Sequence, residues 1–255
     1  MIAPIRNAFL NMRSDVKYAL KQRLRRISKN DIYDHLTERV IRKALGRGSG
    51  CVDVGCHRGD ILELMLRAAP SGYFYAFEPL PNFFAGLKKD FNQANIEIHE
   101  IALSDSDGEA QFNHVVSNPG YSGFLPRRYD RPQETEAKIT VKMRRLDDIV
   151  DPRHRIDLVK IDVEGAELQV LRGATGLLKR DQPVVVFEHG KGAADFYGTG
   201  PQDVHEILVN QCGLAIWLLE DWLSGAPPLT FEAFREQFDE GLNWYFLAAP
   251  VRPRA

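Results

Sequence analysis

The sequence predicts an α/β fold in which a largely parallel sheet lies between layers of helices. From residue 50 onward, short apolar runs alternate regularly with helical patterns, as they do in successive βα units. The first run, at 50–55, leads into a turn that contains Gly55 and Gly59, which is typical of a strand followed directly by a helix. Several runs end in a carboxylate. Because parallel strands end at one edge of a sheet, we expect a ligand site at that edge.

Composition narrows the class of protein. The 255 residues are 44% hydrophobic and 27% charged, which suits one full-sized core, and the formal net charge of -2 gives no general attraction to nucleic acid. The cysteines are Cys51, Cys56 and Cys212, without a Cys-x-x-Cys pair, so a reducing cytosol is expected rather than a disulfide framework or a zinc site. No run of about twenty apolar residues occurs, and we therefore expect a cytoplasmic protein.

Residues 1–48 are expected to form a basic helical extension. Residues 1–47 hold twelve Lys and Arg against four Asp and Glu. Apolar residues recur at helical spacing from Phe9 to Ile27, and a second helix is predicted over 31–45. A basic amphipathic helix suits peripheral contact with an anionic membrane, or a protein partner. The other interpretation, which we favour, is a helical cap packed on the core.

The remaining elements continue the alternation through a domain at 49–250. Strands are expected at 50–55, 73–78, 96–102, 111–116, 138–143, 156–162 and 183–188. Apolar residues between 80 and 91 recur at helical spacing, and the polar segment 104–108 predicts a turn. A long polar loop separates the strands at 111–116 and 138–143. The last apolar runs, 214–218 and 244–248, suit an antiparallel pair.

The turn after the first strand predicts a site for an adenosine-bearing cofactor. Gly55 allows a sharp turn and Gly59 lets the next helix begin close to the sheet, so that backbone amides face a ligand. Glu78, at the end of the second strand, can accept hydrogen bonds from both hydroxyls of a ribose. The turn lacks one glycine of the dinucleotide pattern, and the Asp53 carboxylate would repel a pyrophosphate. S-adenosylmethionine, a phosphate-free cation, therefore fits better than a nicotinamide dinucleotide.

Polar residues at two later strand ends carry the predicted chemistry. Asp162, Glu188 and His189 are expected to be neighbours at the sheet edge. In one hypothesis His189 takes the proton of a substrate hydroxyl, and Glu188 or Asp162 orients it. In the other, Asp162 and Glu188 bind a divalent cation such as magnesium, which polarises the hydroxyl. Glu164 is expected to contact substrate, whereas Glu167 suits the first turn of a helix.

Seven short motifs follow one another between residues 52 and 188. They are Val52-Asp-Val-Gly55, Ala76-Phe-Glu-Pro79, Ala102-Leu-Ser-Asp105, Arg145-Leu-Asp147, Lys160-Ile-Asp-Val-Glu-Gly-Ala-Glu167, Leu171-Arg-Gly-Ala174 and Phe187-Glu188. In this order they resemble the FkbM-type methyltransferases, and several motifs in register are more specific than any one. The resemblance implies a class I, Rossmann-like methyltransferase fold with a seven-stranded, mostly parallel sheet and helices on both faces. It also implies O-methylation, from S-adenosylmethionine, of a sugar, glycan or related natural product.

The same resemblance assigns roles to individual residues. It implies that Asp53, Gly55 and Gly59 line the methionine part of the cofactor, that Glu78 binds the ribose, and that Ser104 and Asp105 border the adenine. The family usually has Ala-Asn where this chain has Cys56-His57, and we expect His57 to touch the cofactor's carboxylate. Asp162 is expected to bind the cofactor as well as to take part in the reaction.

The long polar loop is the predicted substrate side. A Ser-Ser pair of the family appears here as Ser122-Gly123, and Ser122 and the neighbouring Tyr121 are expected to contact substrate. Two other functions stay open at this point. One is an NAD(P)-dependent oxidoreductase on a similar fold, and the other is a non-catalytic module that binds the cofactor. Neither the oligomeric state nor the hydroxyl that is methylated follows from the sequence.

Overall fold

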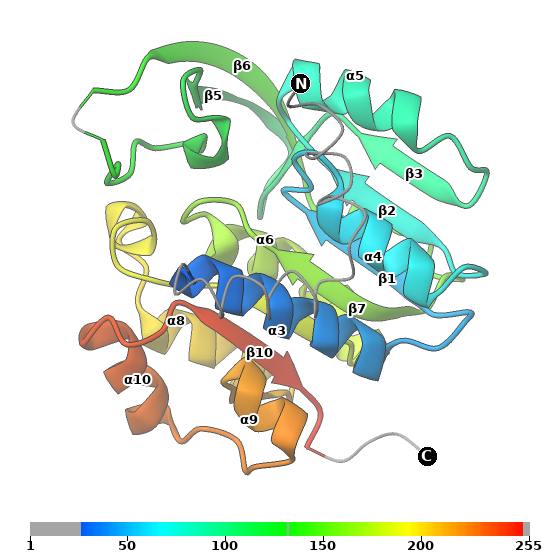
Figure 1. The fold of residues 1–255 in the computed structure, drawn as a ribbon, viewed down its shortest axis with the longest axis vertical. Coiled ribbons are helices and arrows are strands. Elements are labelled where there is room, and N and C mark those ends of the chain that lie inside the picture. Colours follow the sequence, from blue (N-terminus) through cyan, green and yellow to red (C-terminus); the bar gives the residue numbers. More distant parts are fainter. Residues whose placement is uncertain (1–26, 132, 252–255) are drawn as a thin grey trace.

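A seven-stranded sheet forms the centre of the computed structural model, which describes residues 27–131 and 133–251 (Figure 1). Its strands are β1 (Gly50–Val54), β2 (Phe74–Phe77), β3 (Ile96–His99), β7 (Ile156–Ile161), β8 (Val184–Glu188), β9 (Ala215–Trp217) and β10 (Tyr245–Ala249). They lie in the order β3-β2-β1-β7-β8-β10-β9. The pairs from β3 across to β8 are parallel, and β10 runs antiparallel to both β8 and β9. The predicted seven-stranded, mostly parallel sheet and its final antiparallel pair are confirmed.

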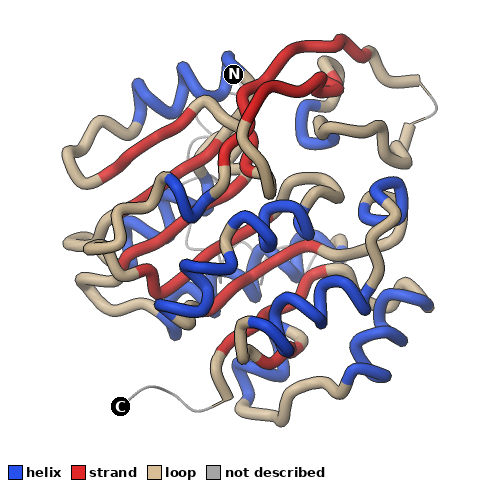
Figure 2. Tube along the Cα trace, turned by 180° about the vertical axis from the view of Figure 1, so that it is seen from behind, coloured by secondary structure: helices blue, strands red, loops and turns tan. Residues whose placement is uncertain are grey.

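Helices cover both faces of this sheet (Figure 2). One face carries α3 (Lys29–Ala44), α4 (Asp60–Ala68), α5 (Pro81–Asp90) and α9 (Leu219–Ser224). The other carries η2 (Leu146–Asp148), α6 (Glu167–Gly173), α7 (Thr175–Asp181), α8 (Pro201–His205), η4 (Glu206–Gln211) and α10 (Phe231–Asp239). Because side chains alternate along a strand, the neighbours Cys51 and Val52 of β1 belong to two different cores.

A smaller sheet lies beyond the edge at which β1 and β2 end (Figure 1). It consists of β4 (Ala102–Leu103), β6 (Glu136–Arg144) and β5 (Gly108–Val115), in that order. The sequence predicted one strand over 96–102, but the chain leaves the central sheet after β3 and pairs with β6 instead. The loop between β5 and β6 carries the short segment η1 (Pro119–Tyr121), and η3 (Ala194–Tyr197) follows β8.

Helix α3 packs on the sheet as a cap. Its first turn is closed by a capping box, in which Asp31 N–H donates to Ser28 Oγ and the Asp31 carboxylate accepts from Ser28 N–H. Val40 and Ile41 are buried in the same core as β1. The basic helix predicted within 9–27 lies outside the described residues, apart from Ile27. Within 27–131 and 133–251, no helix has both the length and the apolar character needed to cross a membrane.

Truncating Ile41 to alanine is expected to lower the free energy of unfolding by about 2–5 kcal/mol, because Ile41 is only 1% exposed and its removal leaves a cavity. Urea denaturation measures this change. Leu242→Ala is the control, since Leu242 is 47% exposed and its truncation is expected to cost about 0.5 kcal/mol or less. Equal losses in the two variants would show that α3 contributes no core packing.

Candidate active site

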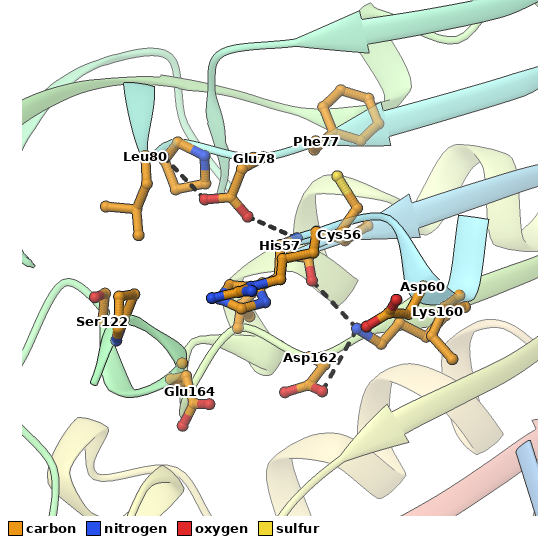
Figure 3. A pocket seen from close by; sticks show the side chains of 18 of the residues that line it. Cys56, His57, Asp60, Phe77, Glu78, Leu80, Ser122, Lys160, Asp162 and Glu164 are labelled. Atoms are coloured by element: carbon orange, nitrogen blue, oxygen red, sulfur yellow. Dashed lines mark hydrogen bonds and ion pairs between the residues drawn. The ribbon is translucent and has the colours of Figure 1, made fainter. Parts of the chain in front are cut away.

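A cavity of about 890 Å³ opens over the carboxyl ends of β1, β2 and β7. This volume lies within the range of about 300–1,000 Å³ that is usual for ligand pockets. The turn after β1 and the segment after β7 form its floor, while the end of β2, helices α3 and α4 and residues of the small sheet form its walls. Figure 3 shows Glu78, Ser122, Lys160 and Asp162 around this space. The site therefore lies at the predicted edge of the sheet.

The glycine turn brings backbone close to backbone in the cavity floor. Gly55 and Gly59 adopt left-handed φ values of 73° and 84°, and Gly59 is the N-cap of α4. A Cβ atom at Gly55 would lie 2.0 Å from the carbonyl oxygen of Asp162, and one at Gly59 would lie 2.5 Å from Phe91 Cε2. Only glycine fits at these two positions.

Glu78 is fixed in the cavity wall by two backbone amides (Figure 3). Its Oε2 accepts from His57 N–H at 2.8 Å and its Oε1 accepts from Leu80 N–H at 2.9 Å. Burial raises the pKa of Glu78, and these two hydrogen bonds oppose that rise. Its carboxylate is therefore held rigidly at the end of β2. His57 also lines the cavity, with its ring centroid 4.1 Å from that of Phe83, and burial lowers the pKa of its imidazole.

Contrary to expectation, Asp53 does not line the cavity. It is fully buried below the floor, with Lys160 Nζ 3.8 Å from its Oδ1, and burial raises its pKa to about 6. In the β1–β7 register Asp53 lies beside Lys160 on the same face of the sheet, and of this pair only Lys160 lines the cavity. Asp53 thus influences a ligand only through its charge and through Lys160.

Ser104 and Asp105 also lie outside the cavity lining. The residues just before them, 101–103, line it instead. Pairing of β4 with β6 fixes this register, because Ser104 N–H donates to the Arg144 carbonyl at 3.0 Å. The Asp105 carboxylate lies 3.9 Å from Arg172 Nη1. Any adenine contact in this region would therefore come from the apolar residues 101–103.

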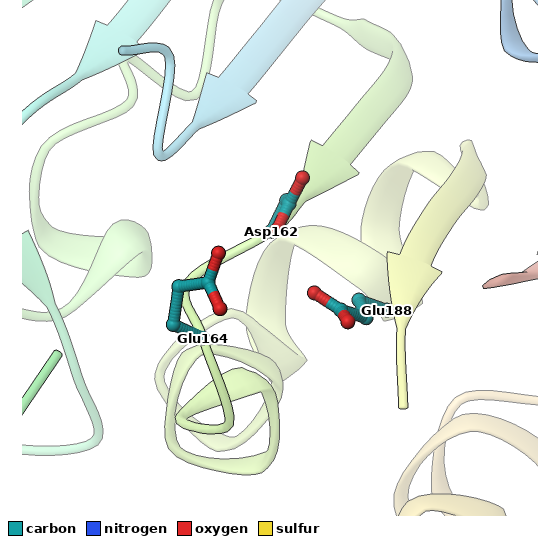
Figure 4. A group of neighbouring side chains, drawn as sticks. All are labelled: Asp162, Glu164 and Glu188. Carbon is teal, nitrogen blue, oxygen red and sulfur yellow. The ribbon is translucent and has the colours of Figure 1, made fainter. Parts of the chain in front are cut away.

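Three carboxylates meet beside β7 and β8 (Figure 4). One oxygen each of Asp162, Glu164 and Glu188 lies within 4.8 Å of the others. Asp162 also lies 3.4 Å from Lys160 Nζ and accepts a hydrogen bond from the Tyr245 hydroxyl. The predicted proximity of Asp162 and Glu188 is thus observed, with Glu164 as a third member.

Burial and neighbouring charges shift the pKa values of Asp162 and Glu188 in opposite directions. Burial would raise the pKa of Asp162, but the Lys160 ammonium and hydrogen bonds from Tyr245 and Glu188 hold it below its usual range. Burial raises the pKa of Glu188 well above its usual range, and the Asp162 charge adds to that rise. The negative charge of this pair therefore favours Asp162, and the proton favours Glu188.

His189 lies away from this cluster, contrary to expectation. It is 1% exposed, its ring stacks on Phe238 at 4.7 Å between centroids, and burial lowers its pKa to about 4. Successive residues point to opposite sides of an extended strand, so Glu188 faces Asp162 while His189 faces α10. His189 is not placed to take a proton from a ligand in the cavity.

Of the three residues that were predicted to contact substrate, two line the cavity. Ser122 and Glu164 line the cavity, but Tyr121 does not. The Tyr121 hydroxyl donates to Asp130, and its ring lies 5.0 Å from the Arg127 guanidinium, which pairs with Glu164. Tyr121 thus reaches the cavity only indirectly, through Arg127.

Two parts of the site were missed from the sequence. Lys160 lies opposite Asp53 in the β1–β7 register and on the same side of β7 as Asp162. A lysine inside an apolar strand is a usable signal, because a buried ammonium needs a partner. The second part is one face of α3, whose cavity-lining residues are Asp31, Asp34, His35, Glu38 and Arg42. Their helical spacing was visible, but nothing local indicated what they would face.

Comparisons with known proteins agree with this architecture. The methyltransferase FkbM domain model matches residues 53–214. The methyltransferase sdnD of Sordaria araneosa is 30% identical over 152 residues, which are 48% of this chain and 59% of that protein. The 2-O-methyltransferase NoeI of Sinorhizobium fredii is 28% identical over 143 residues, 51% and 58% of the two chains. The hexuronic acid methyltransferase AglP of Haloferax volcanii is 29% identical over 140 residues, 52% of each chain. The chain thus spans little more than half the length of these relatives.

A solved structure shares the fold. The crystal structure of methyltransferase FkbM from Methylobacillus flagellatus superposes with a TM-score of 0.50 and 15% sequence identity, over 80% of this chain and 44% of that one. The predicted class I methyltransferase fold is confirmed. Since the family model covers more than half of its residues, the chain belongs to the FkbM methyltransferase family.

Proposed function

We propose that the protein is an S-adenosylmethionine-dependent O-methyltransferase that acts on a hydroxyl of a sugar, glycan or related natural product. The observation that carries the proposal is the Glu78 carboxylate, which two backbone amides hold at the wall of a cavity opened by the glycine turn. Each oxygen keeps a lone pair for a ribose hydroxyl. Gly55, which also lines the cavity, lets the turn after β1 approach the segment after β7 without a clash.

The charge of the cavity wall supports a cationic cofactor. Its acidic residues are Asp31, Asp34, Glu38, Asp60, Glu63, Glu78, Asp162 and Glu164. Its lysine and arginine residues are Arg42, Arg58, Arg67 and Lys160. This excess of carboxylates attracts a sulfonium and opposes a pyrophosphate. An NAD(P)-dependent oxidoreductase is therefore the less favoured function.

The nature of the acceptor is proposed from the relatives and the cavity together. NoeI is named a 2-O-methyltransferase and AglP a hexuronic acid methyltransferase. A cavity of about 890 Å³ suits a cofactor and a small acceptor side by side. Ser122 and Glu164 would then offer hydrogen bonds to the hydroxyls of that acceptor.

In the proposed mechanism the carboxyl pair removes one proton. Bound S-adenosylmethionine would supply an electrophilic methyl group, and the chain contributes alignment and a proton acceptor. Asp162, ionised and exposed to the cavity, takes the hydroxyl proton, while Glu188 and Lys160 orient it. A hydroxyl becomes strongly acidic as its oxygen bonds to the methyl group. A carboxylate with a low pKa is therefore a sufficient acceptor.

Magnesium at the same cluster is the second candidate for activating the hydroxyl. The close approach of Asp162, Glu164 and Glu188 favours it, because Mg²⁺ binds carboxylate oxygens. Lys160 already neutralises Asp162, and Arg127 already neutralises Glu164. We therefore favour the reaction without a metal.

S-adenosylhomocysteine is expected to raise the melting temperature of the protein, and NADH is not. A ligand at a hundred times its Kd stabilises by about 2.7 kcal/mol. For a domain of this size, each kcal/mol raises the melting temperature by about 2–4 °C. A thermal-shift titration measures both ligands, and stabilisation by NADH alone would contradict the proposal.

Turnover distinguishes the remaining alternatives. Release of S-adenosylhomocysteine from S-adenosylmethionine is measured over a panel of methyl glycosides, in EDTA and in MgCl₂. Equal release in both buffers would remove the magnesium hypothesis. Cofactor binding without release for any sugar or other hydroxyl acceptor would favour a non-catalytic binding module.

A further inference from the structure

Tyr245 contacts the central carboxylate of the site from a strand outside the motifs of the family. Its hydroxyl donates a hydrogen bond to Asp162 Oδ2. In the antiparallel pairing of β10 with β8, Tyr245 lies directly opposite Glu188. Directly opposed residues project to the same face of a sheet, so Tyr245 and Glu188 both reach Asp162 from the side of β8 and β10.

Lys160 holds Asp162 from the opposite side. Its ammonium lies 3.4 Å from Asp162 Oδ2, donates to the Gly55 carbonyl at 3.3 Å, and lies 3.8 Å from Asp53 Oδ1. Of these partners, Asp53 belongs to β1 and Gly55 to the turn that follows it. Without an opposing contact, the attraction of Lys160 would draw Asp162 toward β1 and away from the open part of the cavity.

Helix α3 fixes the ring of Tyr245. The ring of Tyr33 stacks on it, with centroids 5.1 Å apart and an interplanar angle of 23°. Tyr33 is itself anchored, because its hydroxyl donates to Asn243 Oδ1 at 2.8 Å and accepts from Trp244 N–H at 3.3 Å. Burial and the charge of Asp162 raise the pKa of Tyr245 well above its usual range, so its hydroxyl stays a neutral donor.

We propose that Tyr245 is a positioning residue, which holds the Asp162 carboxylate where it faces the sulfonium of the methyl donor. The proposal rests on the proposed function of the cavity. Neither Tyr245 nor its support Tyr33 lies within residues 53–214, so the match to the family model does not assign them. Elements outside that segment would then set the geometry of a catalytic group inside it.

The affinities for S-adenosylmethionine and S-adenosylhomocysteine together test this proposal. The two ligands differ by a methyl group and the positive charge on sulfur, so the ratio of their dissociation constants reports a carboxylate that faces the sulfur. General damage to the cavity would weaken both ligands alike. Calorimetric titrations are made on the full chain and on Tyr245→Phe, Asp162→Asn and Tyr75→Phe.

The wild-type chain is expected to prefer the sulfonium ligand, and Asp162→Asn to lose about tenfold of that preference. Tyr245→Phe, which keeps the carboxylate but not its anchor, is expected to lose about threefold to fivefold. Tyr75→Phe is the matched control. Tyr75 is also a buried strand residue, and its hydroxyl lies 2.6 Å from His154 Nδ1, outside the cavity lining. It should keep the wild-type ratio.

Other outcomes of the titrations distinguish failure of this proposal from failure of the proposed function. A wild-type ratio in Tyr245→Phe would overturn the proposal, and so would a wild-type ratio in Asp162→Asn or an absent preference in the wild-type chain. Failure of the wild-type chain to bind either ligand would instead reject the proposed function. Should Tyr245→Phe melt too low for titration, Tyr33→Leu removes the stacked ring and leaves the hydroxyl in place. A reduced ratio in Tyr33→Leu would support the proposal, and an unchanged ratio would contradict it.

Discussion

Replacing Glu78 by alanine is expected to weaken the binding of S-adenosylhomocysteine by about 100-fold or more. Hydrogen bonds to charged groups contribute about 1.5–3 kcal/mol each, and Glu78 is proposed to accept two from the ribose. Each 1.4 kcal/mol corresponds to about a factor of ten in Kd. The change would also leave His57 N–H and Leu80 N–H without their acceptor. Calorimetric titration of the variant measures the loss.

A graded series separates the ribose contact from damage to the turn. Glu78→Gln keeps one acceptor oxygen and the volume of the side chain, so its loss should fall between those of the wild type and Glu78→Ala. Glu97→Ala is the control, because Glu97 lies on β3 outside the cavity lining and its side chain is 52% exposed. Binding by Glu78→Ala with wild-type affinity would rule out Glu78 as the ribose acceptor.

The edge at which the site lies could be predicted from the sequence because it depends only on topology. Apolar runs that alternate with helical patterns give a parallel sheet, and parallel strands all end on one side. This was enough to bring Asp162 and Glu188 together, and to place Glu78 beside the glycine turn. Predicting the positions of these residues required no knowledge of their tertiary contacts.

The face of the sheet to which a side chain points could not be predicted in the same way. His189 turns away from the Asp162 cluster by one position of alternation relative to Glu188. Asp53 faces the same side as Lys160 and Asp162, but it lies below the cavity lining. A polar residue at a strand end can face either side, and the surrounding core decides which. For His189 that core is formed by Phe234 and Phe238 of α10, which lie far along the chain.

Contacts between distant segments were likewise invisible in the sequence. The hydrogen bond from Tyr33 to Asn243 joins residues 210 positions apart, and that from Tyr245 to Asp162 joins residues 83 apart. In the sequence, Tyr33 is only an aromatic residue near the start of a predicted helix, and Tyr245 is only one near the start of a predicted strand. Their role depends on β10 inserting beside β8, and this strand order is fixed by the whole fold.

Adding a single methyl group at Gly55 is expected to damage both stability and binding. In Gly55→Ala the new Cβ would lie 2.0 Å from the carbonyl oxygen of Asp162, which is backbone and cannot rotate away. The left-handed φ of 73° adds about 1–2 kcal/mol of strain for a residue with a side chain. We expect the free energy of unfolding to fall by about 3 kcal/mol or more, and the affinity for S-adenosylhomocysteine to fall with it. Urea denaturation and calorimetry measure the two losses.

Gly86→Ala places the same methyl group where it meets no atom within 4 Å apart from its chain neighbours and the backbone of its own helix. Gly86 lies inside α5, so alanine there should stabilise the protein by about 0.5–1 kcal/mol. The two variants have the same composition and differ only in where the methyl group lies, so the contrast isolates the contact between the turn and the segment after β7. If Gly55→Ala were as stable as Gly86→Ala, the turn would have to move away from Asp162 at little cost. The floor of the cavity would then be too loose to hold the carboxylate in a fixed position.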